Sequence, residues 1–336
     1  MLLTVLCLTL AAPAAAASQN TSWAQREIRV VTLRGLMGGS AASFRPDAPV
    51  TNAALADLVA GLTERRAAAP ADPTAPVTMA KLDAGLVAGL GLRADAAAFA
   101  TAAKTAGLAP PSRFGTEVVA RLLGLRTNHP AGQDTLELLA SDTATRAEAA
   151  FSAAQILGLG DWELQSVDDA AQTFELPDLT TWQRRILRVA LSFIGYPYVW
   201  GGTSEHAQTP LGVATPGGFD CSGFVWRVFK LQAYPREGNL AAVLKGRTTY
   251  SMSGEVPAAQ RIPLAKLQPA DVLFFGSAGP KSKAAQVNHM GIYLGNGWFI
   301  QSSGYGVAVA QLSGWYAQRF AWARRPLAEA GLVSSS

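Results

Sequence analysis

The spacing of apolar residues changes near residue 175, and this change restricts the folds open to the chain more than any other feature. Before it, alanine and leucine recur at the intervals of an α-helix, as at Leu55, Leu58 and Leu62. After it, short apolar runs separated by glycine turns begin at Asp271 and Met290, a pattern typical of antiparallel strands. We therefore predict a mostly helical first half and an α+β second half.

The length also predicts two folded units, because 336 residues exceed the roughly 100 to 200 residues of a usual domain. The segment from Asp161 to Leu179 is acidic, contains Pro177 and has no sustained apolar period. We place the boundary there, with one domain over residues 18–175 and another over residues 176–330. The second domain is expected to open with a helix from Thr181 to Phe193.

The first residues have the features of a secretory signal. An uncharged apolar run from Leu2 to about Leu10 precedes small residues, and it is shorter than the about 20 residues that span a bilayer. We predict a signal peptide over residues 1–17 and no transmembrane span in the mature protein. Cleavage would remove Cys7 and leave Cys221 as the only thiol, so no internal disulfide is expected.

Three segments of the first half share one pattern. They begin at Val50, Val77 and Ala144, and each places a threonine directly before an amphipathic helix. A threonine there can accept a hydrogen bond from a free amide of the first helical turn. Helix capping is therefore sufficient to explain the shared pattern.

Residues 35–58 and 136–157 carry a further likeness, in a glycine-rich turn or a Thr-Arg-Ala-Glu helix start. They resemble S-layer homology repeats, which are about 50 residues long, pack three together and bind wall polysaccharide. The full signature stands only at Thr145–Glu148, and Asn52 and Met79 occupy the place of its arginine in the other two segments. The resemblance implies a wall-binding or targeting domain whose binding of wall polymer is weak or absent.

Cys221 lies where an apolar-periodic segment begins, directly after Gly217, Gly218 and Asp220. A lone thiol is more often an inert buried side chain than a reactive one. At a helix N-terminus, however, free amides and the helix dipole stabilise the thiolate, so we expect a lowered pKa for Cys221. The Cys221 amide could also donate to an oxyanion.

A cysteine nucleophile needs a base, and the chain has three histidines. His129 precedes a proline in the helical half, where an exposed loop position is the better expectation. His206 lies in a polar loop and suits the rim of a substrate site. His289 begins an apolar strand, and this position favours it as the base.

The turn after His289 predicts its neighbours. Asn296 and Gly297 suit a two-residue hairpin turn, which would place His289 just beyond Gly304 and diagonal to Gln301 or Ser303. A polar group there can fix the tautomer and the angle of the imidazole. Gln301 is our candidate.

Four segments taken together resemble the NlpC family of papain-like cysteine peptidases, and they occur in the order of that family. They are GYPYVWGG from Gly195, FDCSGFV from Phe219, LQPADVLFFG from Leu267 and NHMGIYLGNGWFIQSS from Asn288. The resemblance covers residues 181–327. It implies a papain-like fold in which N-terminal helices pack on an antiparallel sheet.

The same resemblance implies roles for single residues. Cys221 is the nucleophile, His289 the base and Gln301 the orienting residue, a position that is histidine in many family members. The substrate-binding residues would be Tyr198, Trp200, Asp220, Ser222 and Ser302. The segment from Thr203 to Gly217 is longer than the usual connection, and Asp271 is expected to cap a turn.

The implied function is a secreted cell-wall hydrolase of a bacterium, located in the wall or at the cell surface. It would cut peptidoglycan stem peptides between D-glutamate and the diamino acid through a thioester, without metal or organic cofactor. The net charge of +4 comes from scattered basic residues, so no nucleic-acid partner is expected. The alternatives are an N-acetylmuramoyl-L-alanine amidase or acyl transferase using the same site, and a non-catalytic wall-attachment protein.

Overall fold

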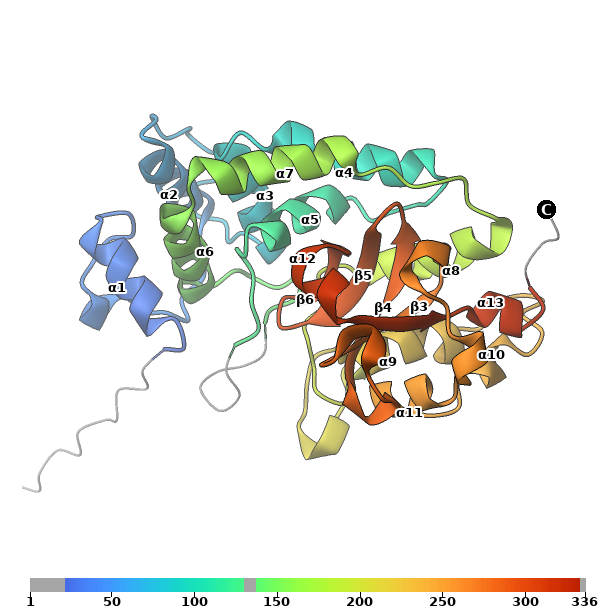
Figure 1. Cartoon of the computed structure of the whole chain (residues 1–336). Coiled ribbons are helices and arrows are strands. Elements are labelled where there is room, and N and C mark those ends of the chain that lie inside the picture. Colours follow the sequence, from blue (N-terminus) through green and yellow to red (C-terminus); the bar gives the residue numbers. More distant parts are fainter. Residues whose placement is uncertain (1–21, 130–136, 333–336) are drawn as a thin grey trace, which may run out of the picture.

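The computed structural model describes residues 22–129 and 137–332 (Figure 1). The predicted signal peptide and Cys7 lie outside these residues. The helices of the first half are α1 (Gln25–Leu33), α2 (Asn52–Thr63), α3 (Met79–Gly89), α4 (Arg93–Thr105), α5 (Phe114–Leu122), α6 (Arg146–Gly158) and α7 (Asp161–Thr173). No strand occurs in the described part of this half, in agreement with the predicted helical fold.

The three threonines of the shared pattern cap helices, as predicted. The side chains of Thr51, Thr78 and Thr145 each accept a hydrogen bond from the backbone N–H three residues later, at the starts of α2, α3 and α6. Each of these bonds satisfies one of the amides that a helix start leaves without an internal partner. Local sequence therefore determines where these helices begin.

The chain just before these three helices closes a ring of backbone hydrogen bonds. The N–H of Val50 donates to the carbonyl of Ala144, that of Ala144 to Val77, and that of Val77 to Val50, at 2.8, 2.9 and 2.9 Å. Buried backbone groups need such partners, and here each segment supplies one to the next. The three segments are thus arranged cyclically and depend on one another.

The second half is built around a five-stranded antiparallel sheet with the order β6-β5-β4-β3-β7. Its strands are β3 (Val272–Gly276), β4 (Val287–Gly295), β5 (Trp298–Ser303), β6 (Gly306–Gln311) and β7 (Phe320–Arg324). Its helices are α8 (Thr181–Ser192), α9 (Cys221–Trp226), α10 (Leu240–Val243), α11 (Thr249–Gly254), α12 (Gly314–Arg319) and α13 (Pro326–Glu329). The α+β class and the helix expected from Thr181 are confirmed.

The hairpin of β4 and β5 turns at the predicted residues. Asn296 and Gly297 have φ angles of 48° and 81°, which suit a two-residue turn that follows the twist of the strands. A β-bulge next to the turn then shifts the register, so that Gly291 lies opposite Gln301. Continued by two residues, this register sets His289 against Ser303 and not beyond Gly304, with Gln301 on the diagonal.

The two halves share one apolar core. The ring of Trp298 in β5 packs edge-on against Phe174, at 5.0 Å between centroids, and against Phe99 of α4, at 6.0 Å. Figure 1 shows α4, α5 and α7 lying over the end of the sheet that carries β5 and β6. The boundary at residue 175 stays a prediction.

Asp271 caps a turn at the start of β3, as expected. Its carboxylate accepts from the N–H of Gln268 at 2.8 Å and pairs with Arg325 at 2.8 Å. Among the described residues, no single helix is long and apolar enough to cross a membrane. Only α3 and α4 pass that test as a pair, and they are bent by 118°.

Candidate active site

Cys221 is the first residue of α9, as the sequence predicts. Asp220 is the N-cap, and its carboxylate accepts the N–H of Gly223. The thiol is 7% exposed and contacts the hydroxyl of Thr249 at 3.4 Å between Sγ and Oγ1. The backbone N–H groups of Ser222 and Met290 lie close enough to the sulfur to favour its thiolate form. Since Met290 follows His289 in β4, the sulfur lies against the strand that carries the base.

The expected lowering of the Cys221 pKa is wrong. Burial raises the pKa of the thiol, and the negative charge of Asp220 adds to this effect. The hydrogen bonds from Thr249, Ser222 and Met290 act in the opposite direction but do not outweigh burial. The sulfur does lie at a helix start, but burial raises the pKa of the thiol by more than the backbone N–H groups lower it.

The ring of His289 is held by Gln301. Nε2 of His289 bonds to Oε1 of Gln301, and Nε2 of Gln301 donates to the hydroxyl of Tyr316 at 2.5 Å. With the carboxamide oxygen as the acceptor, the imidazole proton resides on Nε2, which leaves the Nδ1 lone pair free to accept a proton. The predicted partnership of His289 and Gln301 is thus present, and Tyr316 extends it.

Burial lowers the pKa of His289, and the hydrogen bond to Gln301 only partly opposes this shift. Together with the raised pKa of Cys221, this favours a neutral thiol and a neutral imidazole in the resting site. Among the described contacts, the thiol bonds to Thr249 and not to the imidazole. A rotation of the Cys221 side chain away from Thr249 would therefore precede proton transfer.

Asp220 and Ser222 belong to a polar network around Arg247. The two terminal nitrogens of Arg247 each lie 3.2 Å from an Asp220 carboxylate oxygen, and Nη1 donates to the Ser222 hydroxyl at 2.7 Å. Asp220 also accepts the N–H of Gly201 at 2.9 Å, which fastens the Gly201 loop to the start of α9. The network fixes the rim beside the sulfur.

The other predicted substrate-binding residues occupy different environments. Burial, and next to it the charge of Cys221, raises the pKa of Tyr198, so its phenol lies within electrostatic range of the sulfur. Trp200 is 72% exposed, at the surface. Ser302 is fully buried, and its hydroxyl donates to the carbonyl of Phe219 at 2.6 Å, fastening β5 to the segment before Cys221.

The long connection between the Gly201 loop and Cys221 is an ordered loop whose two ends are paired. It is closed by the short pair β1 (Thr203–Ser204) and β2 (Gly218–Phe219), and Gln208 bridges Thr215 inside it. His206 lies at its surface, with 85% of its side chain exposed.

The expected exposed position of His129 is wrong. Its imidazole stacks on Trp23, with 3.6 Å between ring centroids, and Nε2 lies 2.8 Å from a Glu148 carboxylate oxygen. The side chain is buried because α1 and α6 pack around the chain that follows α5. A proline after a polar residue suggested a loop and gave no sign of these distant helices.

Sequence reasoning missed three functional candidates: Thr249, Arg247 and Tyr316. Thr248 caps α11 by bonding to the N–H of Ser251, a pattern that sequence can indicate. No local pattern shows that the next side chain touches the sulfur. Within residues 22–129 and 137–332, no group of three or more His, Cys, Asp or Glu residues is placed to hold a metal ion.

Comparison with known proteins places this site in a family. Residues 195–325 match the NlpC/P60 family. The chain is 35% identical over 124 residues to a probable endopeptidase of Mycobacterium tuberculosis, covering 37% of this chain and 24% of that protein. It is 32% identical over 131 residues to the gamma-D-glutamyl-L-lysine dipeptidyl-peptidase of Bacillus subtilis, covering 38% and 34%.

A third relative is the murein DD-endopeptidase MepH of Escherichia coli, 35% identical over 135 residues that cover 39% of this chain and 41% of that protein. The aligned region thus spans less than half the length of each of these relatives. The solved structure of the peptidoglycan hydrolase RipB from Mycobacterium tuberculosis is 26% identical over 43% of this chain and 64% of that one, with a TM-score of only 0.33. Residues 195–325 therefore form an NlpC/P60 domain, which at the level of the family is a cysteine peptidase domain.

Proposed function

We propose that the chain is an exported cell-wall hydrolase that cuts peptidoglycan stem peptides between D-glutamate and the diamino acid. The observation that carries the proposal is Cys221 at the start of α9, against the strand in which Gln301 orients His289. The name of the Bacillus subtilis relative refers to the same kind of bond. The signal-like first residues support export to the wall or cell surface.

The mechanism follows from the two neutral groups. As the Cys221 sulfur attacks the amide carbonyl, its proton passes to Nδ1 of His289, and a carbon–sulfur bond forms. Among the described contacts, the N–H of Cys221 donates to no protein group, so it is available to the developing oxyanion. The imidazolium then donates its proton to the leaving amine as the carbon–nitrogen bond breaks.

The second step releases the enzyme. His289, now neutral again, takes a proton from water, the water oxygen attacks the thioester carbonyl, and the proton returns to the leaving sulfur. Gln301 carries no charge, so it holds the tautomer without electrostatic support for the imidazolium. The residues described for this cycle call for no cofactor.

The test is digestion of purified peptidoglycan and of soluble muropeptides, with the products identified by mass spectrometry. The proposed bond yields a free D-glutamate carboxylate and a free amine on the diamino acid. Cys221→Ala should abolish the products while leaving the circular dichroism spectrum unchanged. Full activity of this variant would exclude Cys221 as the nucleophile. Release of intact stem peptides from muramic acid would instead identify the alternative amidase.

For the helical half we propose weak or no attachment to wall polymer, although its segments are arranged like repeats. The cyclic arrangement of the chain before α2, α3 and α6 fits three packed repeats of the S-layer homology kind. Only Arg146 occupies the signature arginine position, and its guanidinium is engaged with Phe44, at 4.3 Å from the ring. We expect weak or no cosedimentation of the full chain carrying Cys221→Ala with protein-free wall polysaccharide, and strong cosedimentation would contradict this.

A further inference from the structure

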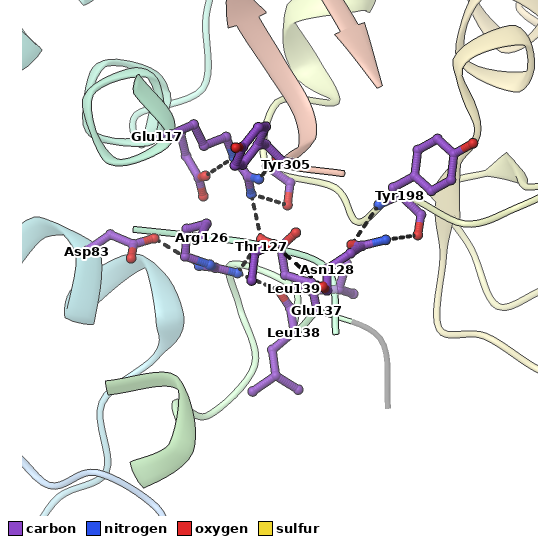
Figure 2. Close-up of polar contacts among 12 residues, drawn as sticks. Asp83, Glu117, Arg126, Thr127, Asn128, Glu137, Leu138, Leu139, Tyr198 and Tyr305 are labelled. Atoms are coloured by element: carbon purple, nitrogen blue, oxygen red, sulfur yellow. Dashed lines mark hydrogen bonds and ion pairs between the residues drawn. The ribbon is translucent and has the colours of Figure 1, made fainter. Parts of the chain in front are cut away.

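Asn128, a residue of the helical half, forms hydrogen bonds to a segment that borders the candidate active site. Figure 2 shows the side-chain amide of Asn128 facing the backbone of Tyr198. Oδ1 accepts the Tyr198 N–H at 3.2 Å, and Nδ2 donates to the Tyr198 carbonyl. The N–H of Asn128 also donates to the carbonyl of Gly304 at 2.9 Å. One residue outside the NlpC/P60 domain therefore binds two segments inside it.

Both of these segments lead to the site. Tyr198 forms a β-bridge with Phe219, two residues before Cys221. Gly304 follows β5, the strand that carries Gln301. Asn128 thus contacts the segment before the nucleophile through its side chain and the segment after Gln301 through its backbone N–H.

The position of Asn128 is fixed by a buried charged cluster in the helical half. The cluster consists of Asp83, Glu117, Arg121, Arg126 and Glu137, each no more than 5% exposed. Arg126, two residues before Asn128, pairs with Asp83 at 2.9 Å and with Glu137 at 2.8 Å. Arg121 donates to the carbonyls of Gly195 and Tyr305, so the cluster is bound to the same two segments.

We propose that Asn128 is a positioning residue that holds Tyr198 as a substrate-contacting wall, so that substrate binding depends on the helical half. This inference rests on the proposed function. Asn128 makes both available backbone bonds to Tyr198, because a side-chain amide offers a donor and an acceptor on two separate atoms. Tyr198 bridges Phe219, two residues before Cys221, and takes no part in the proposed proton transfer, so Asn128 acts on KM more than on kcat.

The test compares Asn128→Ala, Tyr198→Phe and the double variant in the full chain, with soluble muropeptide as substrate. Asn128→Ala should raise KM about tenfold, the effect of losing one to two net hydrogen bonds, and leave kcat within about twofold. In the Tyr198→Phe background the same change should have less than about a third of that effect, because Asn128 acts through Tyr198. Additive effects of the two substitutions would overturn the proposal.

A readout that needs no substrate separates this inference from the proposed function. Hydrogen exchange followed by mass spectrometry should show faster exchange in residues 197–219 of Asn128→Ala, with β3 and β7 unchanged. Unchanged exchange there would overturn the proposal even if the enzyme were active. If Asn128→Ala exchanges faster in these residues but the wild-type chain does not cut peptidoglycan, the positioning of Tyr198 is supported and only the proposed function is wrong.

The matched control is Asn52→Ala. Asn52 also lies in the helical half and donates through Nδ2 to a backbone carbonyl, that of Asp72 at 2.7 Å, away from the catalytic domain. The Asn52→Ala variant should leave KM and the hydrogen exchange of residues 197–219 unchanged. An effect as large as that of Asn128→Ala would mean that both substitutions act by destabilising the helical half. If Asn128→Ala does not fold, Asn128→Ser supplies the same comparison with a smaller loss of polar atoms.

Discussion

Replacing Arg121 by methionine tests how strongly the buried charged cluster joins the two halves. The Arg121 side chain is 1% exposed and pairs with Glu117 at 3.0 Å and Glu137 at 2.8 Å. It also donates to two carbonyls of the catalytic half. Removing one partner from a buried ion pair costs about 3–5 kcal/mol, because the remaining charge is left without compensation. We expect a loss of that size in the free energy of unfolding at pH 8.

The sign of the pH dependence provides a second check. Burial raises the pKa of Glu117, but Arg121 and the other arginines outweigh it, so the wild-type pKa is lowered. That contribution to stability is present above the unfolded pKa and is lost as pH falls. Without Arg121, only Arg126 and Arg113 still oppose burial, so the pKa of Glu117 should be higher in the variant and the stabilising contribution of its carboxylate at pH 8 smaller. The stability difference between variant and wild type should therefore shrink from pH 8 to pH 5.

The measurement is urea unfolding followed by tryptophan fluorescence at both pH values. Arg29→Met is the matched control, because Arg29 is a helical arginine that is exposed and bonds only weakly to Gln25, at 3.4 Å. Its effect should stay within about 0.5 kcal/mol. A loss below about 1 kcal/mol for Arg121→Met, or a loss that grows on acidification, would refute the argument.

Three further outcomes are expected. The rate of Cys221 alkylation by iodoacetamide should reach half its maximum above pH 9, the ordinary thiol value, and a plateau from pH 5 to 7 would mean a resting ion pair. The acid limb of kcat/KM should lie below the ordinary histidine pKa of 6.5, since His289 must be neutral, and Gln301→Glu should move it to higher pH because a carboxylate favours the imidazolium. Gly195→Ala should destabilise by about 2 kcal/mol more than Gly91→Ala in urea unfolding. Both glycines have positive φ, at 86° and 82°, but a Cβ at Gly195 would lie 2.7 Å from the Glu117 carboxyl, whereas a Cβ at Gly91 would meet nothing. Equal losses of stability would contradict the close contact between Gly195 and Glu117.

Local features of the site could be predicted because they depend on residues close together in the chain. Asp220 and the apolar spacing after Cys221 are sufficient to start a helix there, and Thr51, Thr78 and Thr145 cap theirs in the same way. The Asn-Gly turn brings Gln301 to His289, although the bulge beside the turn moved the register by one residue.

Only the tertiary structure decided the chemistry of these residues. The pKa of Cys221 is raised because the packed structure buries the sulfur, and no spacing of residues around position 221 encodes that burial. For the same reason the sequence predicted neither the burial of His129 nor the contact of Asn128 with the site, since their partners Glu148 and Tyr198 come from distant elements. The sequence by itself determined which residues could act and where helices and turns begin. Burial and long-range contacts, which exist only after folding, decided their charge states and which half of the chain holds them in place.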